Sequence, residues 1–199
     1  MTRAAAIAAL CIASLSGCTL FTPVDIDTKK YAVSTIPDDL PAERTHPATL
    51  LVLAPEAAPA YATSRMAYTT RKYQIAYFSQ NEWVDTPAQM MQPLIMETLR
   101  RTHYFSAVLS PPHSGRHTFV LHTEIVELDQ DFTSDPAVLR LTARFDLRQE
   151  ATNRLITAKE LSVQVPLAER TPYAGVVAAN EAMGRLLREL SRLVIENAH

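Results

Sequence analysis

The sequence predicts an α+β fold, a single domain in which two main helices pack on one antiparallel or mixed sheet of about six strands. The clearest strand is Val138 to Arg148, where apolar residues alternate with charged or polar ones. The clearest helix runs from about Tyr173 to Glu196 and repeats apolar residues at helical spacing. A second helix is predicted to begin at Thr86-Pro87, a hydroxyl cap followed by a proline suited to a first turn, and to end near Arg101.

Shorter patterns predict the remaining elements in chain order. Interior Pro93 should either kink the second helix or leave its first turn loose, with regular helix beginning near Gln92. In the predicted strand Thr118–Leu128 the alternation of apolar and polar residues is interrupted near Val126, which predicts a β-bulge there. We expect the last three strands of the chain to form an antiparallel meander. The other predicted strands are Lys30–Thr35, Thr49–Leu53, Arg65–Thr69, Lys72–Ser79, a short strand ending at Leu109, Thr118–Leu128 and Leu155–Val165.

The first 17 residues are predicted to be a secretory signal peptide. Arg3 is followed by an apolar stretch from Ala4 to Leu15 that is too short to cross a bilayer as a helix. The sequence Leu15-Ser16-Gly17-Cys18 resembles the lipobox of bacterial lipoproteins, which are cleaved before the cysteine and carry lipid on it. The alternatives are an ordinary signal peptide with an incidental cysteine, or an anchor that is never cut.

Cysteine usage favours the lipoprotein interpretation. The only other cysteine, Cys11, lies in the segment to be removed, so the mature chain would contain Cys18 alone and no disulfide. In such lipoproteins the sulfur carries diacylglycerol and the amine a further acyl chain, with palmitate as the expected acyl group, and three chains should anchor the protein permanently. Thr19, rather than an aspartate, follows the cysteine, which by resemblance favours the periplasmic face of the outer membrane over the inner membrane.

The chain is predicted to divide into a signal peptide (1–17), a lipidated N-terminus and tether with one short strand (18–47), and an α+β domain (48–199). Removing the signal peptide takes away one basic residue, Arg3. The remaining 182 residues carry 18 Lys and Arg against 21 Asp and Glu, without basic runs. This mildly acidic balance argues against a nucleic-acid partner.

Few residues suggest chemistry. The four glycines are too dispersed for a phosphate-binding loop, and no nucleophile elbow or zinc-protease motif occurs. His113 and His117 flank a polar loop but would need metal ligands from elsewhere. We therefore expect no enzyme activity, no metal and no cofactor besides the covalent lipid.

Along the strand Val138 to Arg148, Arg140, Arg144 and Arg148 share one side. We favour the interpretation that this side is exposed to solvent and that Asp146 and nearby acids balance its positive charge. The alternative is that the arginines form a binding surface for an acidic partner or for lipid headgroups.

One region of the chain carries a family resemblance. It rests on the segments Ser64–Tyr68, Tyr73–Phe78, Glu82–Met90 and Tyr104–Val108. These are similar to the ABC-type transport auxiliary lipoprotein family, which includes the paraquat-inducible lipoprotein that partners a periplasmic MCE protein. The resemblance implies an outer-membrane accessory subunit of an ABC or MCE-type system that transports lipids or hydrophobic compounds. It would act through protein–protein interaction, with an MCE-type protein or ABC transporter components as partners. The protein could also form a homo-oligomeric ring.

Within these segments we single out seven residues as a family motif and candidate partner face: Arg65, Tyr68, Tyr73, Tyr77, Trp83, Pro87 and Phe105. Core packing is their favoured role, because large side chains with one polar tip suit a sheet beneath a helix. Any that are exposed would mark the partner face. The alternative function is that of an outer-membrane lipoprotein regulating a cell-wall synthase or supporting an assembly or secretion machine. A periplasmic hydrolase is less favoured, since it would require a connected catalytic group.

Overall fold

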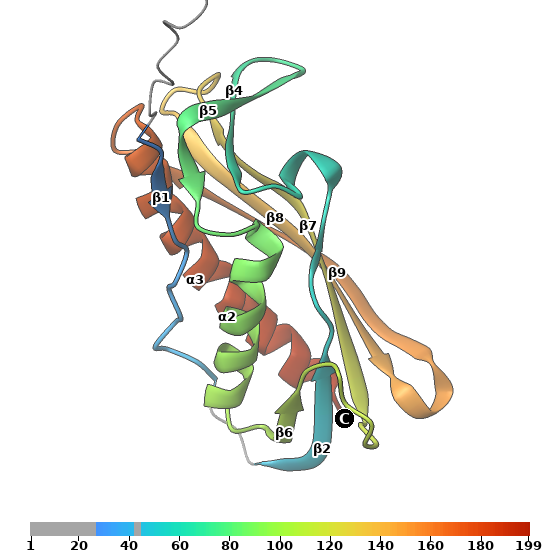
Figure 1. The fold of residues 1–199 in the computed structure, drawn as a ribbon. Helices are drawn as coiled ribbons and strands as arrows, with labels where there is room; N and C mark the ends of the chain where they lie inside the picture. The colour runs from blue at the N-terminus through green and yellow to red at the C-terminus, as the bar shows by residue number, and fades with distance from the viewer. Residues whose placement is uncertain (1–26, 42–44) are drawn as a thin grey trace, which may run out of the picture.

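A long antiparallel meander forms one side of the sheet in the computed structural model, which describes residues 27–41 and 45–199. It consists of β7 (Phe119–Asp131), β8 (Val138–Gln149) and β9 (Arg154–Pro166), as the sequence predicted (Figure 1). The predicted bulge is confirmed, since the register of β7 against β8 shifts between Ile125 and Glu127. The predicted signal peptide, the lipobox and Cys18 lie outside the described residues.

Three shorter strands pair with the edge of β7 that does not contact β8, and each of them is parallel to β7. In order along β7 these are β2 (His46–Val52), β3 (Glu56–Ala57) and β4 (Arg65–Arg71). The sheet then continues through β6 (Phe105–Leu109) beside β2, β5 (Gln74–Trp83) beside β4, and β1 (Lys29–Tyr31) beside β5. The predicted mixed α+β architecture is confirmed, although the described sheet has nine strands rather than about six.

Both main helices cover the same face of this sheet (Figure 1). They are α2 (Pro87–Arg101) and α3 (Pro172–Asn197), and the hydroxyls of Thr86 and Thr171 cap them by accepting hydrogen bonds from Gln89 N and Ala174 N. Helix α2 begins at Pro87 rather than near Gln92, and Pro93 lies inside it. Pro93 is exposed, so solvent can satisfy the carbonyl that loses its helical partner.

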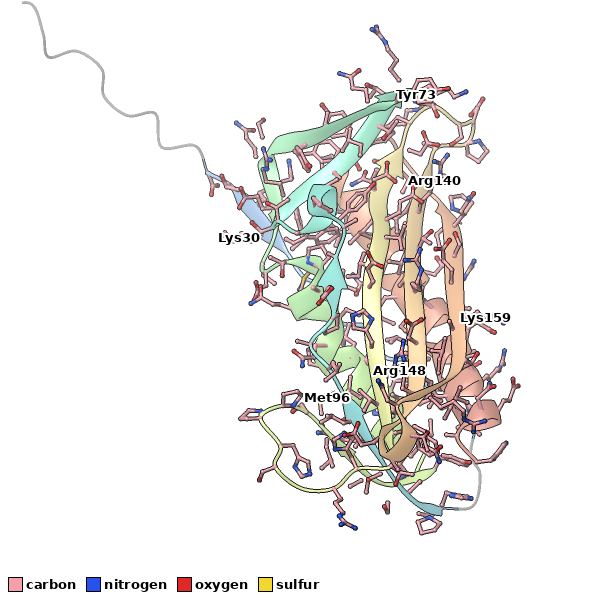
Figure 2. All side chains as sticks on the ribbon, turned by 90° about the vertical axis from the view of Figure 1, so that its right-hand side faces the viewer. Lys30, Tyr73, Met96, Arg140, Arg148 and Lys159 are labelled. Carbon is pink, nitrogen blue, oxygen red and sulfur yellow. The ribbon has the colours of Figure 1, made fainter. Side chains whose placement is uncertain are left out.

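The core lies between the helices and the inner face of the sheet. Every second residue of β8 is buried there, with Leu141 and Phe145 fully buried, as the alternating sequence pattern predicted. Helix α3 contributes a buried apolar stripe: Val176, Ala179, Met183, Leu186, Leu187, Leu190, Leu193 and Val194. The opposite face of the sheet carries polar and charged side chains, so one face is packed and the other is solvated (Figure 2).

The segment after β1 is held against α3. Ser34 N and Thr35 Oγ1 donate to Asn180 Oδ1 at 2.9 and 3.1 Å, and Asn180 Nδ2 donates to Ala32 O at 3.1 Å. Farther along, Arg188 Nε donates to Asp39 Oδ1 at 2.8 Å. The strand predicted over Lys30–Thr35 is therefore shorter in the structure, because a helix side chain replaces a strand partner from residue 32 onward.

Candidate functional site on the β4–β5 hairpin

The hairpin formed by β4 and β5 projects at one end of the sheet (Figure 1). Its turn consists of Lys72 and Tyr73, so both residues lie in the turn rather than in the predicted strand Lys72–Ser79, and β5 begins at Gln74. Tyr73 is 93% exposed and has a φ of 70°, which is unusual for a bulky residue. Its ring centroid lies 4.8 Å from Lys72 Nζ. The tip therefore presents an aromatic ring and a cation to the surroundings.

One side of the hairpin bears an aromatic cluster. The ring of Tyr68 lies 4.5 Å from that of Phe78 and 6.1 Å from that of Phe132, measured between centroids. Phe132 directly follows β7, and the Arg170 guanidinium lies 6.0 Å from its ring centroid. This cluster fixes the hairpin to the end of the meander through half-buried side chains.

The other side of the hairpin is fixed by Tyr77. Its hydroxyl donates a 2.9 Å hydrogen bond to Ala60 O, in the short 3-10 helix η2 (Pro59–Tyr61). The Arg65 guanidinium lies over the Tyr77 ring, 4.0 Å from the centroid. Because each side is held by its own contacts, the hairpin is a supported projection and not a loose loop.

An acidic cavity of about 650 Å³ lies between the hairpin turn and the outer face of the sheet. Its lining includes Lys72 and Tyr73 from the turn, and Glu127, Asp129 and Asp131 from β7. The three acids occupy alternate positions, which places them on one face of the strand. This cavity was not predicted, although the alternation of acids at 127, 129 and 131 is a signal present in the sequence.

Asp129 and Asp131 are both buried but differ in their partners. Asp129 Oδ2 accepts a 2.8 Å hydrogen bond from Thr69 Oγ1, while its buried Oδ1 has no partner among the described residues. Burial raises the pKa of Asp129 to about 6. Burial acts in the same direction on Asp131, but hydrogen bonds from Thr133 and the charge of Arg140 outweigh it and hold the pKa of Asp131 below its ordinary value.

We expect Asp129→Asn to stabilise the protein at neutral pH. Folding raises the pKa of Asp129, so the folded state favours the protonated carboxyl. Ionisation of this group therefore lowers the free energy of unfolding as the pH rises from about 4 to about 6. The substitution should raise that free energy by about 1–2 kcal/mol at pH 7 and have little effect at pH 4. Urea unfolding at both pH values, with exposed Asp38→Asn as the control, measures this. An equal gain at both pH values would contradict it.

A comparison of the sequence with models of known protein families assigns the chain to one of them. The family model of the ABC-type transport auxiliary lipoprotein component matches residues 31–191. The chain belongs to this family. The resemblance inferred from the segments between Ser64 and Val108 is thereby confirmed. Among functionally curated proteins no relative was found by sequence.

Solved structures share the fold of this auxiliary lipoprotein. Protein XCC0632 from Xanthomonas campestris has a TM-score of 0.76 at 14% identity, covering 85% of this chain and 96% of that one. Hypothetical protein CT253 from Chlamydia trachomatis has a TM-score of 0.52 at 11% identity, covering 76% of this chain and 98% of that one. At these identities the likeness concerns the fold alone.

The seven motif residues of this auxiliary lipoprotein fall into three groups. Trp83, Pro87 and Phe105 are buried in the core, which is the role favoured from the sequence. Tyr68 and Tyr77 are half-buried where the hairpin meets the body, and Arg65 and Tyr73 are exposed. The structure therefore does not gather the seven into one surface. Use of the exposed members as a partner face stays a prediction.

Two of the three arginines of β8, Arg140 and Arg144, have acidic partners on the outer face of the sheet, and Figure 2 shows this face. Arg144 donates to Glu124 at 2.9 Å and to Glu160 at 3.1 Å, on the strands to either side. Arg140 pairs with Asp131 and lies 3.7 Å from Glu127, and Arg148 donates to Asn153 O at 3.3 Å. These pairs agree with the favoured interpretation of a charge-balanced, solvated face, although the acids that bond the arginines are not the predicted Asp146.

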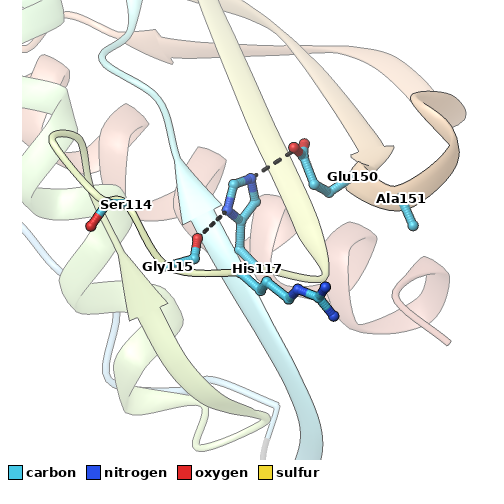
Figure 3. A pocket seen from close by; sticks show the side chains of 6 residues that line it. Ser114, Gly115, His117, Glu150 and Ala151 are labelled. Carbon is cyan, nitrogen blue, oxygen red and sulfur yellow. Dashed lines mark hydrogen bonds and ion pairs between the residues drawn. The ribbon is translucent and has the colours of Figure 1, made fainter.

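The loop that carries His113 and His117 forms a second hollow, of about 490 Å³ (Figure 3). His117 Nε2 lies 3.3 Å from Glu150 Oε2, and His117 Nδ1 lies 3.4 Å from Gly115 O. The rings of the two histidines are 6.5 Å apart. Among residues 27–41 and 45–199, no group of three or more His, Cys, Asp or Glu side chains is placed to hold a metal ion.

No helix in the described part of the chain is long and apolar enough to span a membrane.

Proposed function

We propose that this protein is a lipid-anchored accessory subunit, on the periplasmic face of the outer membrane, of an ABC or MCE-type system that transports lipids or other hydrophobic compounds. The observation that carries the proposal is the family match over residues 31–191, which covers most of the chain. Cleavage before Cys18, diacylglycerol on its sulfur and an acyl chain on its amine would provide the anchor. The role is mechanical rather than enzymatic, and requires no metal or other cofactor.

The contacts of the N-terminal segment support a docking role. Residues 32–39 are held on α3 through Asn180 and Arg188, so the tether reaches the body along a fixed path. Lipid at Cys18 would then restrict both the position and the orientation of the body beside the membrane. A partner protein that spans the periplasm could dock on such an oriented body with less loss of rotational freedom than on a free one.

We include a homo-oligomeric ring in the proposal. The 13-residue strand β9 pairs only with β8 in the described sheet, so its outer edge has backbone groups available to a second copy. The sedimentation coefficient of the purified protein measures its oligomeric state directly.

Affinity purification from native membranes tests the proposed function. After brief cross-linking, the tagged lipidated protein should recover an MCE-type protein together with permease or ATPase components. An unrelated outer-membrane lipoprotein with the same tag serves as the control. Recovery of only cell-wall synthases, or of only secretion components, would favour the alternative function and contradict this one.

A further inference from the structure

We propose that the tip of the β4–β5 hairpin rests on the membrane surface, with the Tyr73 ring among the lipid headgroups. The hairpin tip is defined as residues 71–75, Arg71-Lys72-Tyr73-Gln74-Ile75. The inference rests on the proposed lipid anchor at Cys18, which places the body beside a bilayer. It assigns a partner, an anionic lipid surface, to a part of the molecule that the family assignment leaves without one.

The side chains of the hairpin tip suit a membrane surface. All five residues are exposed, including Tyr73 at 93% and Ile75 at 45%. Tyrosine combines an apolar ring with a polar hydroxyl and is enriched at the boundary between lipid and water. Arg71 and Lys72 add two positive charges, each of which is attracted to anionic lipid. The tip contains no acidic residue.

The conformation of Tyr73 is a second indication. Its φ of 70° lies in the left-handed region, where glycine or asparagine is the usual choice for a hairpin turn. A bulky aromatic residue is strained there and leaves nearly its whole ring in water. Neither the strain nor the exposure contributes to the packing of the described body. Contact of the ring with lipid would give that side chain a favourable environment.

The chain enters β1 from the same end of the sheet as the hairpin tip. Strand β1 is parallel to β5, with Lys29 opposite Asn81 and Tyr31 opposite Trp83. The described residues that precede Lys29, 27 and 28, therefore lie on the side toward the start of β5, where Tyr73 is located. Figure 2 shows Tyr73 at this end of the molecule, and in Figure 1 the β4–β5 hairpin lies at the end of the sheet opposite β6 and β2.

The length of the tether allows both contacts at once. From Asn81 back to Gln74 the strand spans seven residues, or about 23 Å at the rise of a β-strand. Cys18 precedes Lys29 by eleven residues, which can extend over roughly 35–40 Å. The lipid on Cys18 and the hairpin tip can therefore reach one membrane surface together.

The charges around the tip are compatible with that surface. Lys29 and Lys30 are exposed on β1, opposite Asn81 and Glu82 and therefore about 23 Å or more from the tip, so the positive charge of the tip comes from Arg71 and Lys72. The acids of the neighbouring cavity lie behind the tip, where Asp129 and Asp131 are buried and Glu127 and Asp131 face Arg140. The exposed end of the hairpin is therefore positive, although the whole chain has a formal net charge of −2.

A fluorescent probe beside Tyr73 tests this proposal. In the mature lipidated protein Cys18 is alkylated, so Gln74→Cys introduces one free thiol while leaving Tyr73 intact. The labelled protein is reconstituted into phosphatidylethanolamine–phosphatidylglycerol vesicles that contain a lipid-attached quencher. We expect a blue-shifted emission and several-fold stronger quenching than for the same probe at Ala151→Cys, which is exposed in the turn between β8 and β9 at the opposite end of the meander. Adding Tyr73→Ser should remove most of that difference.

Equal quenching at positions 74 and 151 would overturn the proposal. Quenching that is unchanged by Tyr73→Ser would also overturn it. If the probe is shielded only when a cross-linked protein partner is present, the tip is a protein-docking site and the proposal is likewise overturned. The readout involves no transport partner, so its failure would leave the accessory role standing. Conversely, a failed affinity purification would leave the lipid contact of the tip unaffected.

Discussion

Replacing Arg140 with glutamine should lower the free energy of unfolding by about 2–3 kcal/mol at pH 7. Arg140 is the cation that faces buried Asp131, and it also lies 3.7 Å from Glu127. Without it, Asp131 would remain in the cavity as a buried charge without a cation beside it. Removing one partner of a fully buried pair costs about 3–5 kcal/mol, and the smaller value expected here reflects the 35% exposure of the Arg140 side chain.

The pH dependence of the Arg140→Gln effect follows from the lowered pKa of Asp131. A carboxyl whose pKa is lowered on folding contributes stability above its ordinary value of 3.8 and loses it as the pH falls through the folded-state pKa. The destabilisation should therefore be largest near neutral pH and shrink below about pH 4. Arg144→Gln, on the same strand but paired with exposed acids, should cost less than about 1 kcal/mol. Equal losses for the two variants in urea unfolding would contradict a special role for Arg140.

Phe145→Ala is expected to have the largest effect on stability of any single change considered, about 3–5 kcal/mol. Phe145 is completely buried near the middle of β8, the strand that lies between β7 and β9 and contacts α3. Truncation removes the buried ring and leaves a cavity that a regular sheet can close only in part. Phe145→Leu retains most of the apolar volume and should cost about 1–1.5 kcal/mol. Thermal and denaturant unfolding distinguish the two, and a loss below about 1 kcal/mol for the alanine variant would show that this position is not central to the core.

Local sequence patterns predicted the elements that depend on local rules. The alternation of β8, the apolar repeat of α3 and the hydroxyl cap at Thr86 all have the expected structural outcome. The bulge at Val126 was also visible as a slip in alternation. In each case a period or a short-range hydrogen bond determines the structure, and neighbouring residues contain the information.

Long-range pairing could not be predicted in the same way. The two residues of β3 are too few to show a period, and the parallel pairing of β2, β3 and β4 along one edge of β7 depends on contacts between distant segments. Asn180 is a polar residue within a helix, and nothing local indicates that it holds a segment 145 residues away. The helix around Pro93 continues because that position is exposed, a property of the tertiary structure.

The candidate site was predicted in part. The sequence singled out Tyr73 as a motif residue but placed it inside a strand, because aromatic residues at the tip, at the hairpin base and in the core have the same local pattern. Exposure alone separates Tyr73 from Trp83, and exposure follows from the complete fold. The acidic cavity needed two pieces of information: the alternating acids of β7, which the sequence shows, and the hairpin turn that faces them, which it does not.

The central claim, a lipid on Cys18 that fixes a periplasmic docking subunit to the membrane, is tested most directly by mass spectrometry of the protein from its native membranes. The expected N-terminal peptide begins at Cys18 and carries diacylglycerol on the sulfur and an acyl chain on the amine, and no peptide from residues 1–17 is present. An unmodified Cys18, or a chain that retains residues 1–17, would contradict the account.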